Sequence, residues 1–150
     1  AWGAAQRGGA CRLPTEAEWE HAAVGAAGRR FAYGDAFDPL AANTHAAHVR
    51  QPSPVGAFPA GDTPEGLVDM TGNVYEWTAS AWGRHDEAAD FSYPYDPADG
   101  REAPDLPDDV RRVMRGGSWN DPALQAHAVY RGFDHPGGRG PDYGMRLACG

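Results

Sequence analysis

The chain of 150 residues contains no lysine, so its 13 basic side chains are all arginines; 21 acidic residues give a formal net charge of -8. A phosphate backbone attracts a basic surface, and the only basic cluster here is the short one at Arg111, Arg112 and Arg115. We therefore expect no nucleic-acid binding. No apolar stretch approaches the roughly 18 residues of a membrane-spanning helix. We therefore expect no membrane span.

Cysteine is also scarce, with only Cys11 and Cys149, which lie near opposite ends of the sequence. These two thiols could pair, but they are far from the disulfide framework of a small secreted domain. A small buried thiol is the commoner use of cysteine. We therefore favour two free, buried cysteines, and the alternative of a disulfide between them stays open. The compartment stays open, with the cytoplasm favoured.

Glycine, proline and aromatic residues are abundant instead. The 20 glycines and 13 prolines exclude a helical bundle or a coiled coil, because both residues interrupt helices. A hydrophobic content of 41% with 11% aromatic residues is enough for a packed core. The length suits one domain. These values predict a globular domain rich in ordered loops.

One helix is predicted over residues 16–24. Thr15 and Glu18 have the spacing of a capping box, in which each side chain satisfies the other's backbone N–H. Trp19 supplies the buried stripe, and Gly25 ends the helix. Short strands with β-branched and aromatic content are expected at 74–78, 112–115, 128–131 and 144–148. Together these elements predict an α+β domain.

Five motifs occur in order along the chain: RLPTEAEWE at 12–20, PVG at 54–56, GLVDMTGNVYEW at 66–77, RGGSW at 115–119, and YR with GMRLA between 130 and 148. They resemble the formylglycine-generating enzyme (sulfatase-modifying factor) family. The resemblance implies a C-type lectin-like fold with a small twisted antiparallel sheet. It makes residues 1–150 a single domain that corresponds to the C-terminal part of family members. The N-terminal strand and helix of those members are then lacking, and a second chain could supply them.

The chain departs from the oxidising enzymes of this family at one decisive place. Those enzymes bind copper with two cysteines shortly after the Gly-Gly-Ser-aromatic motif, and the resemblance places Asp121 and Ala126 at these positions. Thiolate is the soft ligand that Cu(I) requires, and neither a carboxylate nor a methyl group replaces it. We therefore expect no copper and no oxidase activity.

Three kinds of relative lack this cysteine pair: the C-terminal domains of ergothioneine-pathway sulfoxide synthases, catalytically silent paralogues, and the variable proteins of diversity-generating retroelements. The stretches 93–102 and 113–120 are most similar to the variable proteins. The resemblance then implies a non-catalytic domain that displays loops 119–143 to a protein or other macromolecular ligand. The alternative is a fragment of a divergent oxidoreductase whose metal is held by another segment or chain.

Aromatic and adaptable polar side chains within the predicted loops are candidate ligand-binding residues, because binding surfaces combine the two kinds. The candidates are Trp119, Asn120, Asp121, Leu124, Gln125, His127, Phe133, Asp134, His135, Asp142 and Tyr143. The alternative is that Trp119 and Leu124 belong to the core and that the other residues form a solvated loop.

A structural calcium ion is implied at two turns, because hard oxygen ligands in tight loops suit Ca²⁺. The first candidate site comprises Thr71, Gly72, Asn73, Val74 and Glu76, and the second comprises Asn43 and Thr44. In the alternative interpretation, Asn73 caps a turn and Glu76 pairs with an arginine. The arginines at 115, 131 and 146 are expected to form buried ion pairs with Glu18, Glu20 or Glu76.

Overall fold

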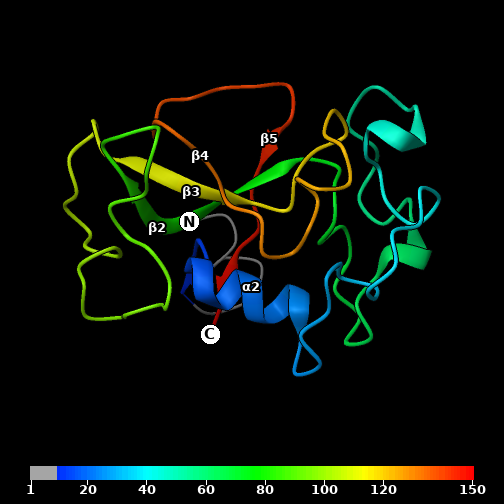
Figure 1. Cartoon of the computed structure of the whole chain (residues 1–150), viewed down its shortest axis with the longest axis horizontal. Helices are drawn as coiled ribbons and strands as arrows, with labels where there is room; N and C mark the ends of the chain where they lie inside the picture. Colours follow the sequence, from blue (N-terminus) through cyan, green and yellow to red (C-terminus); the bar gives the residue numbers. More distant parts are fainter. Residues whose placement is uncertain (1–9) are drawn as a thin grey trace.

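The computed structural model describes residues 10–150, which form a small twisted sheet with one helix against it and long loops around it (Figure 1). The strands β2 (Tyr75–Gly83), β3 (Arg111–Arg115), β4 (Gly132–Asp134) and β5 (Tyr143–Gly144) lie in the order β4-β3-β2-β5. The β2–β3 and β3–β4 pairs are antiparallel, whereas β2 and β5 run parallel. The α+β class and the C-type lectin-like fold are thus confirmed.

The helix α2 (Glu16–Val24) has the predicted boundaries and cap. The Thr15 hydroxyl accepts a hydrogen bond from the Glu18 N–H at 3.2 Å, and the Glu18 carboxylate accepts one from the Thr15 N–H at 2.8 Å. Gly25 ends the helix with a φ of 59°. Trp19 is buried between α2 and the sheet, where it joins a small core with Ala23 and Met70.

The strand predicted at 128–131 is wrong, because the backbone there is used by other partners. The Ala128 N–H donates to the Arg30 carbonyl at 2.8 Å, and the Arg115 guanidinium donates to the carbonyls of Val129 and Tyr130. These groups are therefore unavailable to a sheet ladder. The strand begins later, as β4, in a stretch that sequence patterning assigned to a loop.

The other strand boundaries also shift. The strand predicted at 74–78 continues to Gly83 as β2, and the long excursion after it remains largely irregular up to β3. The strand predicted at 144–148 is broken into β5 and β6 (Ala148–Cys149). The break falls at Arg146, whose side chain turns to the carboxylate of Glu76, with an Nε–Oε2 distance of 2.5 Å. Two short 3-10 helices, η1 (His45–Ala47) and η2 (Pro59–Gly61), lie in the loops.

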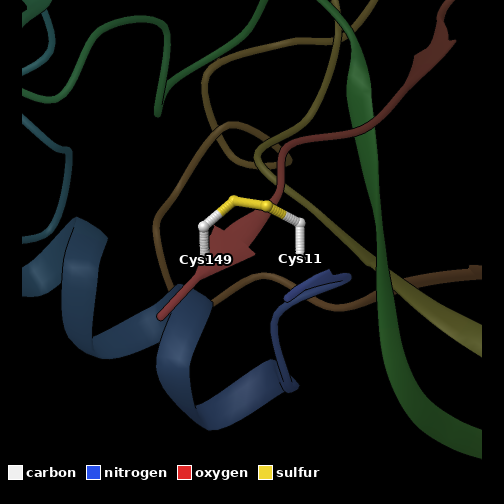
Figure 2. Close-up of a disulfide and its surroundings, with 2 residues drawn as sticks. All are labelled: Cys11 and Cys149. Carbon is white, nitrogen blue, oxygen red and sulfur yellow. A yellow bond between two sulfur atoms is a disulfide. The ribbon is translucent and has the colours of Figure 1, made fainter. Parts of the chain in front are cut away.

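The expectation of free, buried cysteines is wrong. Cys11 and Cys149 form a disulfide that joins β1 (Cys11–Arg12) to β6 beside α2 (Figure 2). The two residues are register partners in this small antiparallel pair, with their Cα atoms 4.2 Å apart. Cys11 is half-buried and Cys149 is exposed. The two cysteines are separated by 138 positions in the sequence, so their proximity could not be predicted from local sequence and arises only in the folded chain.

A buried ion-pair network lies between α2 and the sheet. Fully buried Glu16 accepts hydrogen bonds from Arg131 at 2.6 and 2.9 Å, and Arg115 and Arg101 lie 3.5 and 4.0 Å from its carboxylate. Arg115 also pairs with Glu20. The predicted partners are therefore right for Arg115 with Glu20 and for Arg146 with Glu76, but the partner of Arg131 is Glu16.

Glu18 forms a surface pair instead. Its carboxylate pairs with Arg12 at 2.7 Å, and both side chains are largely exposed. The hydrogen bond from Arg12 lowers the pKa of the Glu18 carboxyl to about 2. In the described part of the chain, no helix is long and apolar enough to cross a bilayer.

Candidate functional site

The candidate ligand-binding residues lie on three segments: the loop after β3, the strand β4 with the loop that follows it, and the start of β5. Asn120, Leu124 and His135 are exposed, and the other eight are half-buried. The exposed fraction of the Leu124 side chain is 66%, so the alternative that placed it in the core is wrong for this residue. The three segments are therefore at least partly accessible to a ligand.

The turn after β3 is held by close backbone packing. Gly117 has a φ of 69°, and a Cβ on it would lie 2.8 Å from the Gln125 carbonyl oxygen and 3.0 Å from the Cα of Ala126. Only glycine combines this backbone conformation with such a close approach. The chain can therefore fold back so that the 119–127 loop stands at the end of the sheet.

Two carboxylates converge on one hydroxyl at this place. Fully buried Ser118 donates to Asp121 at 2.6 Å, and its Oγ lies 3.4 Å from a carboxylate oxygen of Asp142. The parallel pairing of β2 with β5 brings Asp142 there, since the Tyr75 N–H donates to the Asp142 carbonyl at 2.7 Å. Beside them, the Tyr143 hydroxyl donates to Asp134 at 2.9 Å. We name Ser118, Asp121, Asp142, Tyr75 and Tyr143 the Ser118 cluster.

The phenols of the Ser118 cluster stay protonated at neutral pH. Burial, and next the charge of Asp121, raises the pKa of Tyr75 well above its ordinary value. Burial, and next the hydrogen bond to Asp134, raises the pKa of Tyr143 to about 12. The Ser118 hydroxyl has no exposed surface, so it cannot reach a substrate. The hydroxyl groups of the cluster therefore donate hydrogen bonds, and its carboxylates attract positive charge. The cluster lacks an accessible nucleophile.

Not every candidate residue joins this cluster. Phe133 stacks on Trp82 with ring centroids 4.4 Å apart, on the opposite face of β4 from Asp134, because side chains alternate along a strand. His127 packs edge-on against Phe31 at 4.7 Å, where burial lowers its pKa. Conversely, sequence reasoning missed Tyr75 and Ser118. Alternation along β2 would have placed Tyr75 on the face opposite to Glu76.

The positions that carry the copper-binding cysteines in oxidising relatives are occupied by residues of a different kind. Ala126 is fully buried, and Asp121 accepts the hydrogen bond from Ser118. Both cysteines of the chain are joined in the disulfide between the terminal strands. Across residues 10–150, no group of three or more His, Cys, Asp or Glu side chains is placed to hold a metal ion.

Glu76, in the first candidate calcium site, is used by other groups. Its carboxylate accepts from the Trp19 indole at 2.6 Å and from Arg146 at 2.5 and 2.7 Å. Asn73 has a φ of 66°, and its side-chain oxygen accepts from the Ser53 N–H at 2.9 Å. A guanidinium on the same carboxylate would repel a cation, so Glu76 does not fit a calcium ligand.

The other residues of this first turn are held by tight packing. The Thr71 hydroxyl accepts from the Ala32 N–H at 3.1 Å. A Cβ on Gly72 would lie 2.3 Å from the Asn43 carbonyl oxygen, and a Cβ on Gly144 would lie 2.6 Å from a methyl group of Val74. These contacts fix the turn against its neighbours through packing and backbone hydrogen bonds.

The second candidate site retains free oxygens. The Asn43 amide nitrogen donates to the Gln51 carbonyl at 3.0 Å, which leaves the side-chain Oδ1 buried and without a partner. The Thr44 hydroxyl is also buried without a partner. Buried polar atoms normally have partners, so two adjacent unsatisfied oxygens are compatible with a cation ligand set.

Comparison with known proteins assigns the family. The sulfatase-modifying factor enzyme 1-like domain model matches residues 2–149. Hercynine oxygenase of Mycolicibacterium smegmatis is 38% identical over 144 residues, which cover 91% of this chain and 32% of that protein. The inactive C-alpha-formylglycine-generating enzyme 2 of Bos taurus is 34% identical over 155 residues, covering 93% of this chain and 44% of the relative.

A solved structure agrees. Treponema denticola variable protein 1 superposes with a TM-score of 0.72 at 32% identity, covering 94% of this chain and 48% of that one. The chain thus spans less than half the length of each of these three relatives. Because the family model matches nearly every residue and the fold agrees, the protein belongs to the sulfatase-modifying factor enzyme 1-like domain family.

Proposed function

We propose that this domain is a non-catalytic ligand-binding module that presents loops 119–143 to a protein or other macromolecular ligand. The observation that carries the proposal is the replacement of a thiolate pair by Asp121 and buried Ala126, in loops whose candidate binding side chains are exposed or half-buried. The similarity to a variable protein and to an inactive formylglycine-generating enzyme supports it.

The contrast between buried and exposed residues within the loops also supports a function in ligand display. Buried Ser118, Ala126 and Ala128 hold the loop after β3, while Asn120 and Leu124 face solvent. Side chains on the exposed positions can change without a large effect on folding, because the buried positions and the sheet carry the stability. This is the arrangement that a surface of variable binding specificity needs.

The proposal predicts no oxidation of a cysteine peptide. With a sulfatase-derived peptide that contains the substrate cysteine, oxygen consumption should equal the protein-free blank, with or without added copper, because the site lacks the thiolates that bind Cu(I). An active formylglycine-generating enzyme assayed in parallel is the positive control. Oxygen uptake that depends on both this protein and the peptide would contradict the proposal.

The second candidate function is a part of a divergent oxidoreductase. The 38% identity to a hercynine oxygenase favours it, and in that case residues outside this chain would hold the metal. The two functions differ in their gene neighbourhood. An adjoining iron-binding helical domain would favour the enzyme, whereas a reverse transcriptase with a near-copy of the coding region that differs at adenines would favour the variable protein.

A structural calcium ion is proposed at Asn43 and Thr44 in preference to Glu76, on the strength of the two unsatisfied oxygens. There it would neutralise buried oxygens and order the loop. Removing calcium with a chelator should then lower the Tm, and adding calcium back should restore it. Asn43→Ala should abolish this calcium-dependent shift, and Glu87→Gln should keep it. An identical melting curve with and without chelator would end the proposal.

The disulfide changes the expected location. Disulfides form and persist in oxidising compartments and are rare in the cytosol. We therefore propose an oxidising compartment in place of the cytoplasmic location favoured from composition.

A further inference from the structure

The outer face of the sheet carries aromatic side chains. On β2, Glu76 and Ser80 contact α2 residues, since Glu76 accepts from Trp19 and Ser80 accepts from the Glu16 N–H. Side chains alternate along a strand, so Tyr75 and Trp77 face away from α2. Trp77 packs edge-on against Tyr143 of β5 with ring centroids 5.8 Å apart. All three aromatic side chains are half-buried. The helix α2 packs against one side of the sheet (Figure 1).

Three carboxylates border this aromatic face. Carboxylate oxygens of Asp121 and Asp142 lie 2.6 and 3.4 Å from the Ser118 Oγ, and Asp134 accepts a hydrogen bond from the Tyr143 hydroxyl. The charges of all three raise the pKa of Tyr143, which places them around one phenol. Arg112 is the register partner of Asp134, but within the described residues no arginine or histidine nitrogen lies within 4.0 Å of a carboxylate oxygen of the three.

Elsewhere in the described residues, eight arginines pair with eight carboxylates, and none of these carboxylates borders the face. Ten ion pairs join arginines to carboxylates at other places, and the carboxylates at Glu16 and Glu76 are fully engaged there. Carboxylates gathered on half-buried surface repel one another more strongly than they would in open water. A positive group from another molecule would relieve that repulsion.

The guanidinium group matches both parts of the surface. Its planar set of donors fits carboxylate oxygens, and its flat face stacks on aromatic rings. An ammonium group is a strongly hydrated point charge and lacks the planar match. A nucleic acid would be repelled by the same carboxylates.

We propose that the outer face of the sheet is a docking site for an arginine-bearing segment of a partner protein, whose guanidinium group bridges Asp121 and Asp142 and lies against the neighbouring aromatic rings. The inference rests on the proposed display function, since it names the ligand chemistry of the same loops. The partner is defined by charge complementarity: the face is acidic and aromatic, and the whole chain is acidic.

The test is a titration of the isotope-labelled protein with an acetylated, amidated tri-arginine peptide, followed by NMR. Amide shifts should concentrate at Asp121, Asp142 and Tyr143. The matched peptide with citrulline at each position has the same shape without the charge, and it should bind at least tenfold more weakly. A tri-lysine peptide should also bind several-fold more weakly than tri-arginine.

Asp121→Asn and Asp142→Asn should each weaken tri-arginine binding several-fold, and together at least tenfold, because asparagine keeps an acceptor for Ser118 but loses the charge. Glu87→Gln is the control. It removes one charge from an exposed residue beyond the far end of β2, a strand about 26 Å long at roughly 3.3 Å per residue, and should leave the affinity unchanged.

Equal binding of the citrulline peptide, unchanged affinity in the double variant, or the absence of any binding of tri-arginine would each overturn the assignment. The display function is tested apart from it. A random peptide library selected on the wild-type domain would still yield peptides that depend on loops 119–143, but without arginine enrichment, if only the ligand chemistry were wrong. Recovery of no loop-dependent peptide would count against both.

Discussion

Glu16→Gln is expected to lower the free energy of unfolding by about 3–5 kcal/mol, because breaking a buried ion pair leaves an uncompensated charge in the interior. Glu16 is fully buried between three guanidinium groups. Arg115 and Arg101 keep Glu20 and Asp99 as partners after the substitution. Arg131 loses its only carboxylate partner and keeps neutral acceptors alone, the glutamine oxygen and the Phe91 carbonyl, so it accounts for most of the loss. Urea unfolding of the purified variant measures the effect.

The neighbouring acid provides the control. Glu18 pairs with Arg12 at the surface, where the side chains are 46% and 58% exposed, and glutamine can still complete the capping box. Glu18→Gln should therefore cost less than about 1 kcal/mol. Arg131→Met combined with Glu16→Gln should be less destabilising than the sum of the two single variants, since the pair acts as a unit. Equal, small effects of Glu16→Gln and Glu18→Gln would show that the buried network does not stabilise the fold.

Replacing both Cys11 and Cys149 with serine is expected to lower the free energy of unfolding by about 2–5 kcal/mol. The disulfide closes a loop with a sequence separation of 138 residues, and a cross-link over so long a loop restricts the unfolded chain strongly. The two-residue strands β1 and β6 have little other means of staying together. Comparison of the Tm of the wild type with that of the double variant measures the effect.

Reduction by dithiothreitol should reproduce the shift in the wild-type protein and leave the double variant unaffected, which separates the disulfide from other effects of the reductant. The core cluster around Trp19 and Met70 contains neither cysteine, so the reduced protein should stay folded at moderate temperature. A Tm that does not depend on reductant in the wild type would contradict the role assigned to the cross-link.

The sequence by itself determined the local features, because their physical causes lie within a few residues. The helix at 16–24 follows from Thr15, Glu18 and Gly25, whose capping and terminating effects operate over one turn. The motifs identified the family and hence the fold. The absence of a cysteine pair after the Gly-Gly-Ser-Trp motif follows directly from the residues.

Only the tertiary structure decided features that join distant residues. The pairing of Cys11 with Cys149, of Glu16 with Arg131, and of Asp121 with Asp142 on Ser118 spans 138, 115 and 21 positions, and no local pattern encodes such contacts. Strand propensity also does not reveal when a distant side chain occupies the backbone groups of a segment. Here the side chain of Arg115 donates to the carbonyls of Val129 and Tyr130, which are then not available to a strand partner. Interactions between residues close in the sequence determine helices and turns, whereas ion pairs between distant residues depend on the tertiary fold.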